Sequence, residues 1–266
     1  MSIGINLSPH RLCNFHCVYC QVQGRVVGGD GVLSEKMPVV TRAVDMTLLR
    51  TELEQTARWV MDGTLFEVSP FSQVEPEHRH LKDFAFSGDG EPTFSPDFPD
   101  ALEILVQVKK SLGFNPCKLV LITNATGLHV ESVYKACDLL VSAGGEIWAK
   151  LDAGTPQWYN RINGSSVPYE RIVENLDFAA HRWGIVVQTM LLQYDGQTMS
   201  EAQFDAYCQR LEQIIRSGGK IQRVQLYTVA RTPVSPLACS LDDATMRSFQ
   251  ERLAKRTGLK VDVFFA

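Results

Sequence analysis

The sequence predicts an α/β fold: a partial, open (β/α)6-type barrel with an extra strand at its C-terminal end. After about residue 80, short β-branched or aromatic runs alternate with amphipathic stretches, and a glycine often separates a helix from the next strand. Strands that alternate with helices form parallel sheets with right-handed crossovers. About seven strands are counted in 266 residues, which suits a partial barrel better than a closed eightfold one.

The first half of the chain supplies two strands and two helices. A short apolar run, Ile3–Ser8, is the first strand. Val44–Met61 is predicted to be a helix because its apolar side chains recur along one helical face. Asp83–Ser87 is strand-like, and Phe98–Leu112 has the apolar spacing of a helix that ends at Gly113, a typical C-cap residue.

The second half continues the alternation and contains no Pro/Ser linker, charge block or repeat that would mark a boundary. We therefore expect one domain over residues 1–266. The predicted strands are Lys118–Thr123, Glu146–Asp152, Ile185–Leu191, Arg223–Val229 and Leu259–Phe265. The predicted helices are Val130–Cys137, Tyr169–Trp183, Glu201–Ser217 and Asp243–Thr257.

Two stretches interrupt this rhythm and are predicted to be loops. Gln21–Val40 is rich in glycine, and Glu67–Leu81 contains two prolines and two histidines. Long loops in compact domains are often functional.

Composition narrows the function classes. The net charge of −4 and the pI near 5.9 do not fit a chain whose main task is to grip a phosphate backbone. No window approaches the length of a membrane span, and no signal-peptide pattern is present. We therefore expect a cytoplasmic protein without a membrane partner. Seven cysteines, an odd number with uneven spacing, favour reduced thiols.

Three cysteines cluster directly after the first strand. Cys13, Cys17 and Cys20 have the spacing C-x3-C-x2-C, and thiolates this close converge on one soft metal centre. Three ligands are one short of the four cysteines that normally hold a cubane iron–sulfur cluster. The alternative is a structural zinc site with His16 or a distant residue as its fourth ligand.

The other four cysteines are scattered along the chain and are predicted to be small buried hydrophobic residues. They are Cys117, Cys137, Cys208 and Cys239. Because they form no second cluster, we expect no auxiliary iron–sulfur centre.

A second unusual segment, Ser87-Gly88-Asp89-Gly90-Glu91-Pro92-Thr93, follows the second strand. Its two glycines let the backbone turn sharply and approach a ligand. Glu91, held in place by Pro92, is an acceptor suited to an ammonium group. Functional groups in parallel (β/α) folds gather at the C-terminal ends of the strands, so this turn and the cysteines are expected to meet. The alternative is an ordinary turn.

These two motifs together resemble the radical S-adenosylmethionine (SAM) superfamily. The resemblance implies that Cys13, Cys17 and Cys20 bind a [4Fe–4S] cluster, whose open iron is completed by the methionine amine and carboxylate of SAM. It implies that Tyr19 lies against the adenine and that the turn holds the methionine amine. The turn residues are Gly88, Asp89, Gly90, Glu91 and Pro92. A one-electron donor such as flavodoxin or ferredoxin would reduce the cluster, and SAM would yield a 5′-deoxyadenosyl radical that abstracts hydrogen from a substrate.

Later strands supply further cofactor-binding candidates. Side chains alternate along a strand, so Trp148, Lys150 and Asp152 share one face. Charges there are expected to point into the barrel lumen, because facing the helices would be costly. Lys150 is expected to meet the SAM carboxylate. Asp152 is expected to accept from the ribose hydroxyls, as a polar residue at this place does in the family. The alternative is an internal Lys150–Asp152 ion pair.

Three more polar residues are weaker candidates at later strands. Asn124 ends the strand KLVLIT, Gln188 lies inside IVVQTML, and Arg231 lies just past RVQLYTVA, where it would suit an anionic substrate group.

Within the superfamily, FSGDGEPTF and CNFHCVYCQ look most like the iron–sulfur oxidoreductases related to wyosine-synthesising tRNA enzymes. Those enzymes carry extra cysteines ahead of the main motif, whereas none of the twelve residues before Cys13 is a cysteine. A small-molecule or peptide substrate is therefore favoured over tRNA. The alternatives are a tRNA-modifying enzyme, a glycyl-radical-enzyme activase and, in another class, a non-catalytic electron carrier or zinc protein. The loops Gln21–Val40 and Glu67–Leu81 are expected to form a substrate lid.

Overall fold

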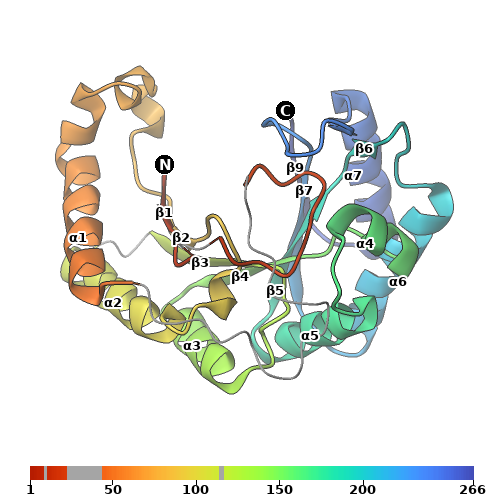
Figure 1. The fold of residues 1–266 in the computed structure, drawn as a ribbon, viewed down its shortest axis with the longest axis horizontal. Coiled ribbons are helices and arrows are strands. Elements are labelled where there is room, and N and C mark those ends of the chain that lie inside the picture. The colour runs from red at the N-terminus through yellow and green to blue at the C-terminus, as the bar shows by residue number, and fades with distance from the viewer. Residues whose placement is uncertain (9–10, 23–43, 114–116) are drawn as a thin grey trace.

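The centre of the molecule is a curved sheet of seven parallel strands in the order β1-β2-β3-β4-β5-β7-β9. The computed structural model describes residues 1–8, 11–22, 44–113 and 117–266. The strands are β1 Ser2–Ile5, β2 Asp83–Phe86, β3 Lys118–Thr123, β4 Glu146–Lys150, β5 Ile185–Met190, β7 Ile221–Tyr227 and β9 Val261–Phe264. The sheet bends so that its two edge strands, β1 and β9, stand on opposite arms (Figure 1). The predicted open partial barrel with an extra C-terminal strand is confirmed.

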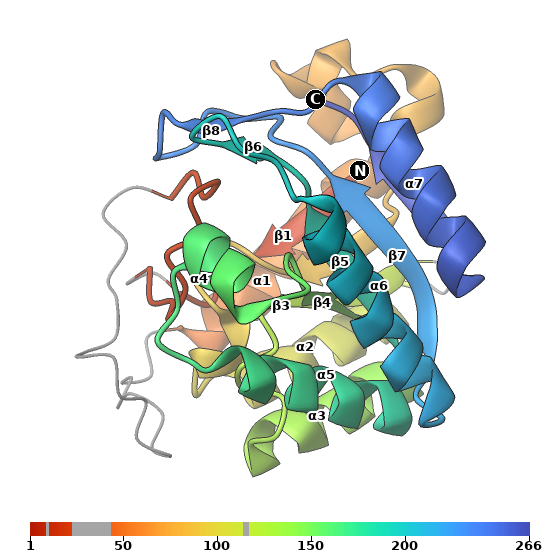
Figure 2. The same cartoon turned by 90° about the vertical axis from the view of Figure 1, so that its right-hand side faces the viewer.

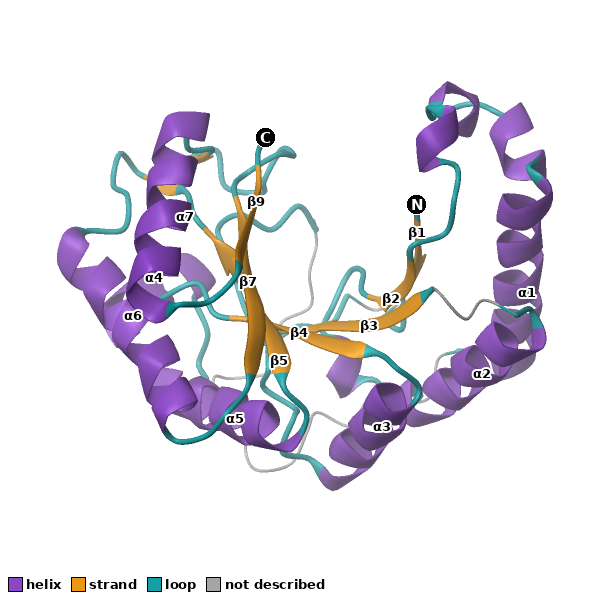
Figure 3. Cartoon of the chain, turned by 180° about the vertical axis from the view of Figure 1, so that it is seen from behind, coloured by secondary structure: helices purple, strands orange, loops and turns teal. Residues whose placement is uncertain are grey.

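Helices cover the convex side of the sheet and leave the concave side to loops (Figure 3). The longer helices are α1 Met46–Asp62, α2 Phe98–Ser111, α3 Glu131–Ser142, α5 Tyr169–Arg182, α6 Glu201–Arg216 and α7 Asp243–Thr257. Local sequence sets their limits: Asp45 and Asp242 cap the first turns of α1 and α7, and α6 begins in a capping box of Ser200 and Gln203. No helix in the described ranges is long and apolar enough to cross a membrane.

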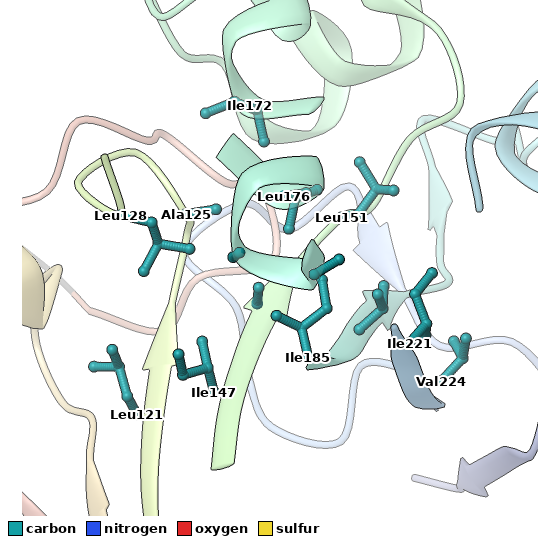
Figure 4. Close-up of a cluster of buried hydrophobic side chains, with 14 of the residues drawn as sticks. Leu121, Ala125, Leu128, Ile147, Leu151, Ile172, Leu176, Ile185, Ile221 and Val224 are labelled. Atoms are coloured by element: carbon teal, nitrogen blue, oxygen red, sulfur yellow. The ribbon is translucent and has the colours of Figure 1, made fainter. Parts of the chain in front are cut away.

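The hydrophobic core lies between the sheet and these helices. Alternate strand residues such as Leu121 and Ile147 point outward and are buried against helical residues such as Leu176 (Figure 4). The intervening residues, including Trp148 and Lys150, face the concave lumen and line a cavity there. One cluster of buried apolar side chains runs from the first strand to the last.

Three short elements depart from the sequence prediction. An eight-residue helix, α4 Pro156–Asn163, follows β4 and is capped by Thr155, whose hydroxyl accepts from the N–H of Trp158. Two-residue strands β6 Gln193–Tyr194 and β8 Ala238–Cys239 pair antiparallel above the main sheet. Elements this short carry too few periodic residues to stand out in a sequence. The predicted strand Glu146–Asp152 ends at Lys150, so Asp152 lies in the loop beyond it.

The lid prediction for Glu67–Leu81 is wrong. The segment contains short 3-10 turns, η2 Phe71–Gln73 and η3 Pro76–His78, and follows η1 Thr64–Glu67. It returns from α1 to the amino end of β2, where the Met1 ammonium donates to the carbonyl of His80. None of its residues lines the large cavity at the carboxyl ends of the strands. The other proposed lid segment, Gln21–Val40, lies outside the described residues from position 23 onward.

Candidate functional site

A cavity of about 900 Å³ occupies the concave side of the sheet, at the carboxyl ends of the strands. It brings together residues from six different parts of the chain. The predicted residues that line it are Cys13, Cys17, Tyr19, Cys20, Gly88, Asp89, Gly90, Glu91, Asn124, Lys150, Asp152, Gln188 and Arg231. Pro92 does not line the cavity; it is buried and begins the 3-10 helix η4, Pro92–Phe94.

Hydrogen-bond donors lie close to the sulfur atoms of the three clustered cysteines. The backbone N–H of Phe15 lies 3.4 Å from Cys13 Sγ, and that of Val22 lies 3.5 Å from Cys20 Sγ. Burial raises the pKa of the Cys17 thiol to about 11, and a bound cation would reverse this by stabilising the thiolate. N–H donors around cysteine sulfurs are typical of iron–sulfur sites, so this donor set fits such a cluster.

Within the described ranges, no three His, Cys, Asp or Glu side chains lie close enough together to hold a single metal ion. A cubane cluster does not need that convergence, because each cysteine ligates a different iron atom. The remaining cysteines are apart from the site. Cys117, Cys137 and Cys208 are buried as predicted, but Cys239 is exposed, because it lies on the short strand β8 outside the core.

Helix α4 holds the cysteine loop (Figure 2). The last carbonyls of a helix have no partner inside the helix. Here the N–H of His16 donates to the carbonyl of Asn163 at 2.7 Å, and that of Val18 donates to Ile162 at 2.9 Å. The side-chain amide of Asn163 also donates to Cys17 Sγ at 3.4 Å. The loop therefore supplies donors to the last carbonyls of α4, and α4 supplies a donor to the loop.

Asn124, directly after β3, also forms hydrogen bonds with the cysteine loop. Its amide nitrogen donates to Asn14 Oδ1 at 2.8 Å and lies 3.8 Å from Cys13 Sγ, while its oxygen accepts from the N–H of Thr126. Asn14 donates in turn to the hydroxyl of Thr126. Asn124, predicted to contact the cofactor, lines the cavity, and its amide also binds the cysteine loop.

The glycine turn packs directly on the cysteine loop. The N–H of Glu91 donates to the carbonyl of Leu12 at 2.9 Å. A Cβ at Gly90 would lie 2.2 Å from Ser8 Oγ and 2.3 Å from that carbonyl oxygen, so only glycine fits. Gly88 has a φ of 138°, a conformation that favours glycine. Among the described residues, no backbone N–H donates to the carbonyls of residues 88–90.

Glu91 is a buried anchor with 3% of its surface exposed. Its carboxylate accepts from the N–H and hydroxyl of Thr93, the hydroxyl of Thr123 at 2.6 Å and the N–H of Asn124 at 2.7 Å. Burial raises the pKa of Glu91 while these bonds oppose the rise. With four donors from three residues, the carboxylate joins the turn to the end of β3.

Asp152 is a second buried carboxylate hub, a side chain that accepts from several elements, and it is also 3% exposed. Its Oδ2 accepts from the hydroxyl of Tyr19 at 2.5 Å and from the amide of Asn163 at 2.7 Å, and its Oδ1 accepts from the N–H of Met190 at 2.8 Å. Burial and the neighbouring Asp152 raise the pKa of Tyr19 well above its usual value, so its hydroxyl stays a donor. Only Oδ1 keeps a lone pair without a partner among the described residues.

The lumen wall beyond these hubs is polar. Burial alone would lower the pKa of Lys150, but Cys17 and Asp152 raise it overall, so the side chain stays an ammonium. The alternative of an internal Lys150–Asp152 ion pair is not supported, because the two side chains make no hydrogen bond to each other among the described residues. Gln188 donates to Gln225 Oε1 at 3.0 Å and to the hydroxyl of Tyr227 at 3.3 Å.

Sequence reasoning missed Asn14, Thr123 and Asn163, which hold the predicted residues in place. Asn14 lies inside the cysteine motif, which was a usable signal. Asn163 is 146 positions from Cys17, and nothing in its local sequence marks it.

The family model of the Radical SAM superfamily matches residues 7–205. A curated relative, GTPase Obg of Brachyspira hyodysenteriae, is 22% identical over 98% of this chain, and the chain spans about a third (33%) of its length. The activity named for the whole of that protein is therefore not transferred.

Solved structures share the fold. SuiB of Streptococcus suis, crystallised with SAM, has a TM-score of 0.62 at 13% identity, over 100% of this chain and 51% of that one. Archaeal TYW1 has a TM-score of 0.51 at 16% identity, over 94% and 74%. A variant of spore photoproduct lyase has a TM-score of 0.54 at 10% identity, over 96% and 74%. At these identities the likeness concerns the fold alone.

Proposed function

Because this chain belongs to the Radical SAM superfamily, whose enzymes use a [4Fe–4S] cluster and SAM, we propose that Cys13, Cys17 and Cys20 ligate three irons of that cluster. One observation supports this assignment most strongly: the three cysteines line the same cavity as the glycine turn. The donors around their sulfurs suit thiolates that carry negative charge.

The fourth iron is left for SAM. We assign its methionine amine to the backbone carbonyls of residues 88–90. These residues line the cavity, and their carbonyls accept from no backbone N–H in the described part of the chain. Glu91 fixes this turn through its four hydrogen bonds, so it acts on the amine chiefly by positioning those carbonyls. Lys150 lines the same cavity, and its ammonium group suits the SAM carboxylate.

The nucleoside of SAM is assigned to the Tyr19 side of the cavity. The hydroxyl of Tyr19 is held by Asp152, which leaves the ring face available to an adenine. A ribose hydroxyl would use the remaining lone pair on Asp152 Oδ1. These two residues therefore orient the nucleoside together.

One-electron reduction of the cluster would cleave SAM to methionine and a 5′-deoxyadenosyl radical that abstracts hydrogen from a substrate. The donor of that electron is proposed to be a flavodoxin or ferredoxin. We favour a small-molecule or peptide substrate in the polar lumen beside Gln188, Tyr227 and Arg231, all of which line the cavity. Membership of an enzyme superfamily argues against a non-catalytic electron carrier or a zinc protein.

Anaerobic reconstitution with iron and sulfide, followed by dithionite and SAM, tests the proposal. We expect four irons per chain and formation of 5′-deoxyadenosine. Cys17→Ala should lose both, whereas the matched variant Cys137→Ala, which removes a buried thiol from α3, should keep both. A folded wild-type protein that binds zinc tightly and forms no 5′-deoxyadenosine would refute the assignment.

A further inference from the structure

Asn163, the last residue of α4, donates to both Cys17 and Asp152 from one amide group. It is 1% exposed. Its Nδ2 donates to Cys17 Sγ at 3.4 Å and to Asp152 Oδ2 at 2.7 Å. An amide nitrogen carries two hydrogens, so each acceptor receives its own. The nitrogen, rather than the oxygen, must face them because a thiolate and a carboxylate both accept.

The amide is held rigidly in this position. The backbone carbonyl of Asn163 accepts from the N–H of His16 at 2.7 Å, inside the cysteine motif itself. Asp152 is fixed by the hydroxyl of Tyr19 and the N–H of Met190. Backbone and side chain of Asn163 are therefore both anchored, and the donor to Cys17 is oriented before any cofactor binds.

A fixed donor on a ligating sulfur affects the two redox states of a cluster unequally. Reduction adds negative charge that spreads onto the thiolates, and a hydrogen bond to sulfur stabilises the more negative state. Hydrogen bonds to metal ligands from outside the ligand set tune the metal in this way. The amide nitrogen of Asn163 lies 3.4 Å from Cys17 Sγ, closer than the amide nitrogen of Asn124 lies to Cys13 Sγ, at 3.8 Å.

We propose that Asn163 is a positioning residue that raises the reduction potential of the cluster through its hydrogen bond to Cys17, with Asp152 holding the amide in place. This inference rests on the proposed function, because it requires Cys17 to be a cluster ligand. It assigns a role to α4, the helix that the sequence did not reveal.

The test is a redox titration followed by electron paramagnetic resonance on the reconstituted protein without SAM, so the readout is a potential and not an activity. Asn163→Leu keeps the number and branching of the side-chain heavy atoms and removes the donor. At a given applied potential, the ratio of reduced to oxidised cluster in this variant should be about tenfold lower than in the wild type, the scale of one hydrogen bond to a charged group. That ratio corresponds to a reduction potential about 59 mV more negative for a one-electron couple.

Asn175→Leu is the matched control. Asn175 is a buried asparagine of α5 whose amide also makes two hydrogen bonds, to the carbonyls of Ala125 and Thr126 at 3.0 Å each, and touches no sulfur. Its potential should equal that of the wild type. An equal shift in both variants would mean that general loosening moves the potential, and it would overturn the proposal.

Unchanged potential in Asn163→Leu with an intact cluster would also overturn it. If the leucine variant holds no cluster, Asn163→Ser is titrated instead. Its cluster should again have a more negative reduction potential than that of the wild type, because serine is too short to reach both acceptors. Loss of the cluster from both variants, in folded protein, would make Asn163 purely structural. A wild-type protein that binds no cluster would refute the proposed function itself, which is a separate outcome.

Discussion

Single residues at this site act mostly by holding the backbone in position. Glu91 and Asp152 are buried carboxylates that line the cavity, and each accepts most of its hydrogen bonds from protein donors. Carboxylates that accept from several protein donors rigidify a site. The chemistry belongs to the cofactors, while these side chains set where the cofactors lie.

Gly90 gives the sharpest prediction at this scale. A Cβ there would lie 2.3 Å from the backbone oxygen of Leu12, so Gly90→Ala must separate the glycine turn from the cysteine loop. We expect a loss of about 1–3 kcal/mol in unfolding free energy, the usual cost of overpacking, and at least tenfold weaker SAM binding. Urea unfolding and anaerobic calorimetry measure the two effects.

Gly4→Ala is the matched control on the neighbouring strand. A Cβ at Gly4 would meet only Ser87 Oγ, at 3.7 Å, an ordinary contact. It should leave stability and SAM binding close to wild type. If the two variants behaved alike, close packing at Gly90 would not be what shapes the site.

At the scale of elements, charged side chains join strands across the lumen. Glu146 of β4 accepts from Lys118 of β3 and Arg223 of β7, at 2.6 Å each, and from Trp148 at 2.8 Å. Strands β4 and β7 are not neighbours, since β5 lies between them. The Glu146–Arg223 contact therefore spans the concave side and supports the curvature of the sheet.

This network predicts a pH-dependent stability. Burial alone would raise the pKa of Glu146, but Arg223, Lys118 and Trp148 outweigh it and lower the pKa to about 2. A depressed folded-state pKa stabilises the protein above the unfolded value near 4.5, by at most about 3 kcal/mol, and this stabilisation disappears as the pH falls toward 2. Glu146→Gln should therefore be less stable than wild type at pH 7, with a gap that narrows below pH 4.5.

Urea unfolding between pH 7 and pH 3 measures this gap. Glu77→Gln is the control, because the Glu77 side chain is 79% exposed beside His78 and surface pairs contribute little. A Glu146 gap that stayed constant with pH would contradict an ionised network.

At the scale of the whole molecule, the sequence predicted the sheet and most of the residues around the cavity. Alternating strands and helices determine a parallel sheet, and parallel strands bring their carboxyl ends together. That is why Cys13, Gly88 and Lys150, far apart in the chain, line one cavity. The single domain over residues 1–266 stays a prediction, as does the cytoplasmic location.

What the sequence did not predict depends on contacts between distant residues. The amide of Asn163 reaches Cys17 and Asp152 only after α4 has docked on the cysteine loop. The position of Glu67–Leu81 follows from topology, because a segment that leads from a helix into a strand returns to the amino end of the sheet. Hydrogen-bond partners of Glu91 and Asn124 likewise appear only in the folded chain.

The central claim is that three cysteines leave one iron open and that SAM fills the vacancy. Electron–nuclear double resonance on the reduced, reconstituted protein tests it most directly, with SAM labelled by nitrogen-15 in its methionine amine. We predict a nitrogen-15 coupling to the cluster spin, and the same coupling in Cys137→Ala. Bound SAM without any such coupling, in a sample that holds an intact cluster, would contradict the claim.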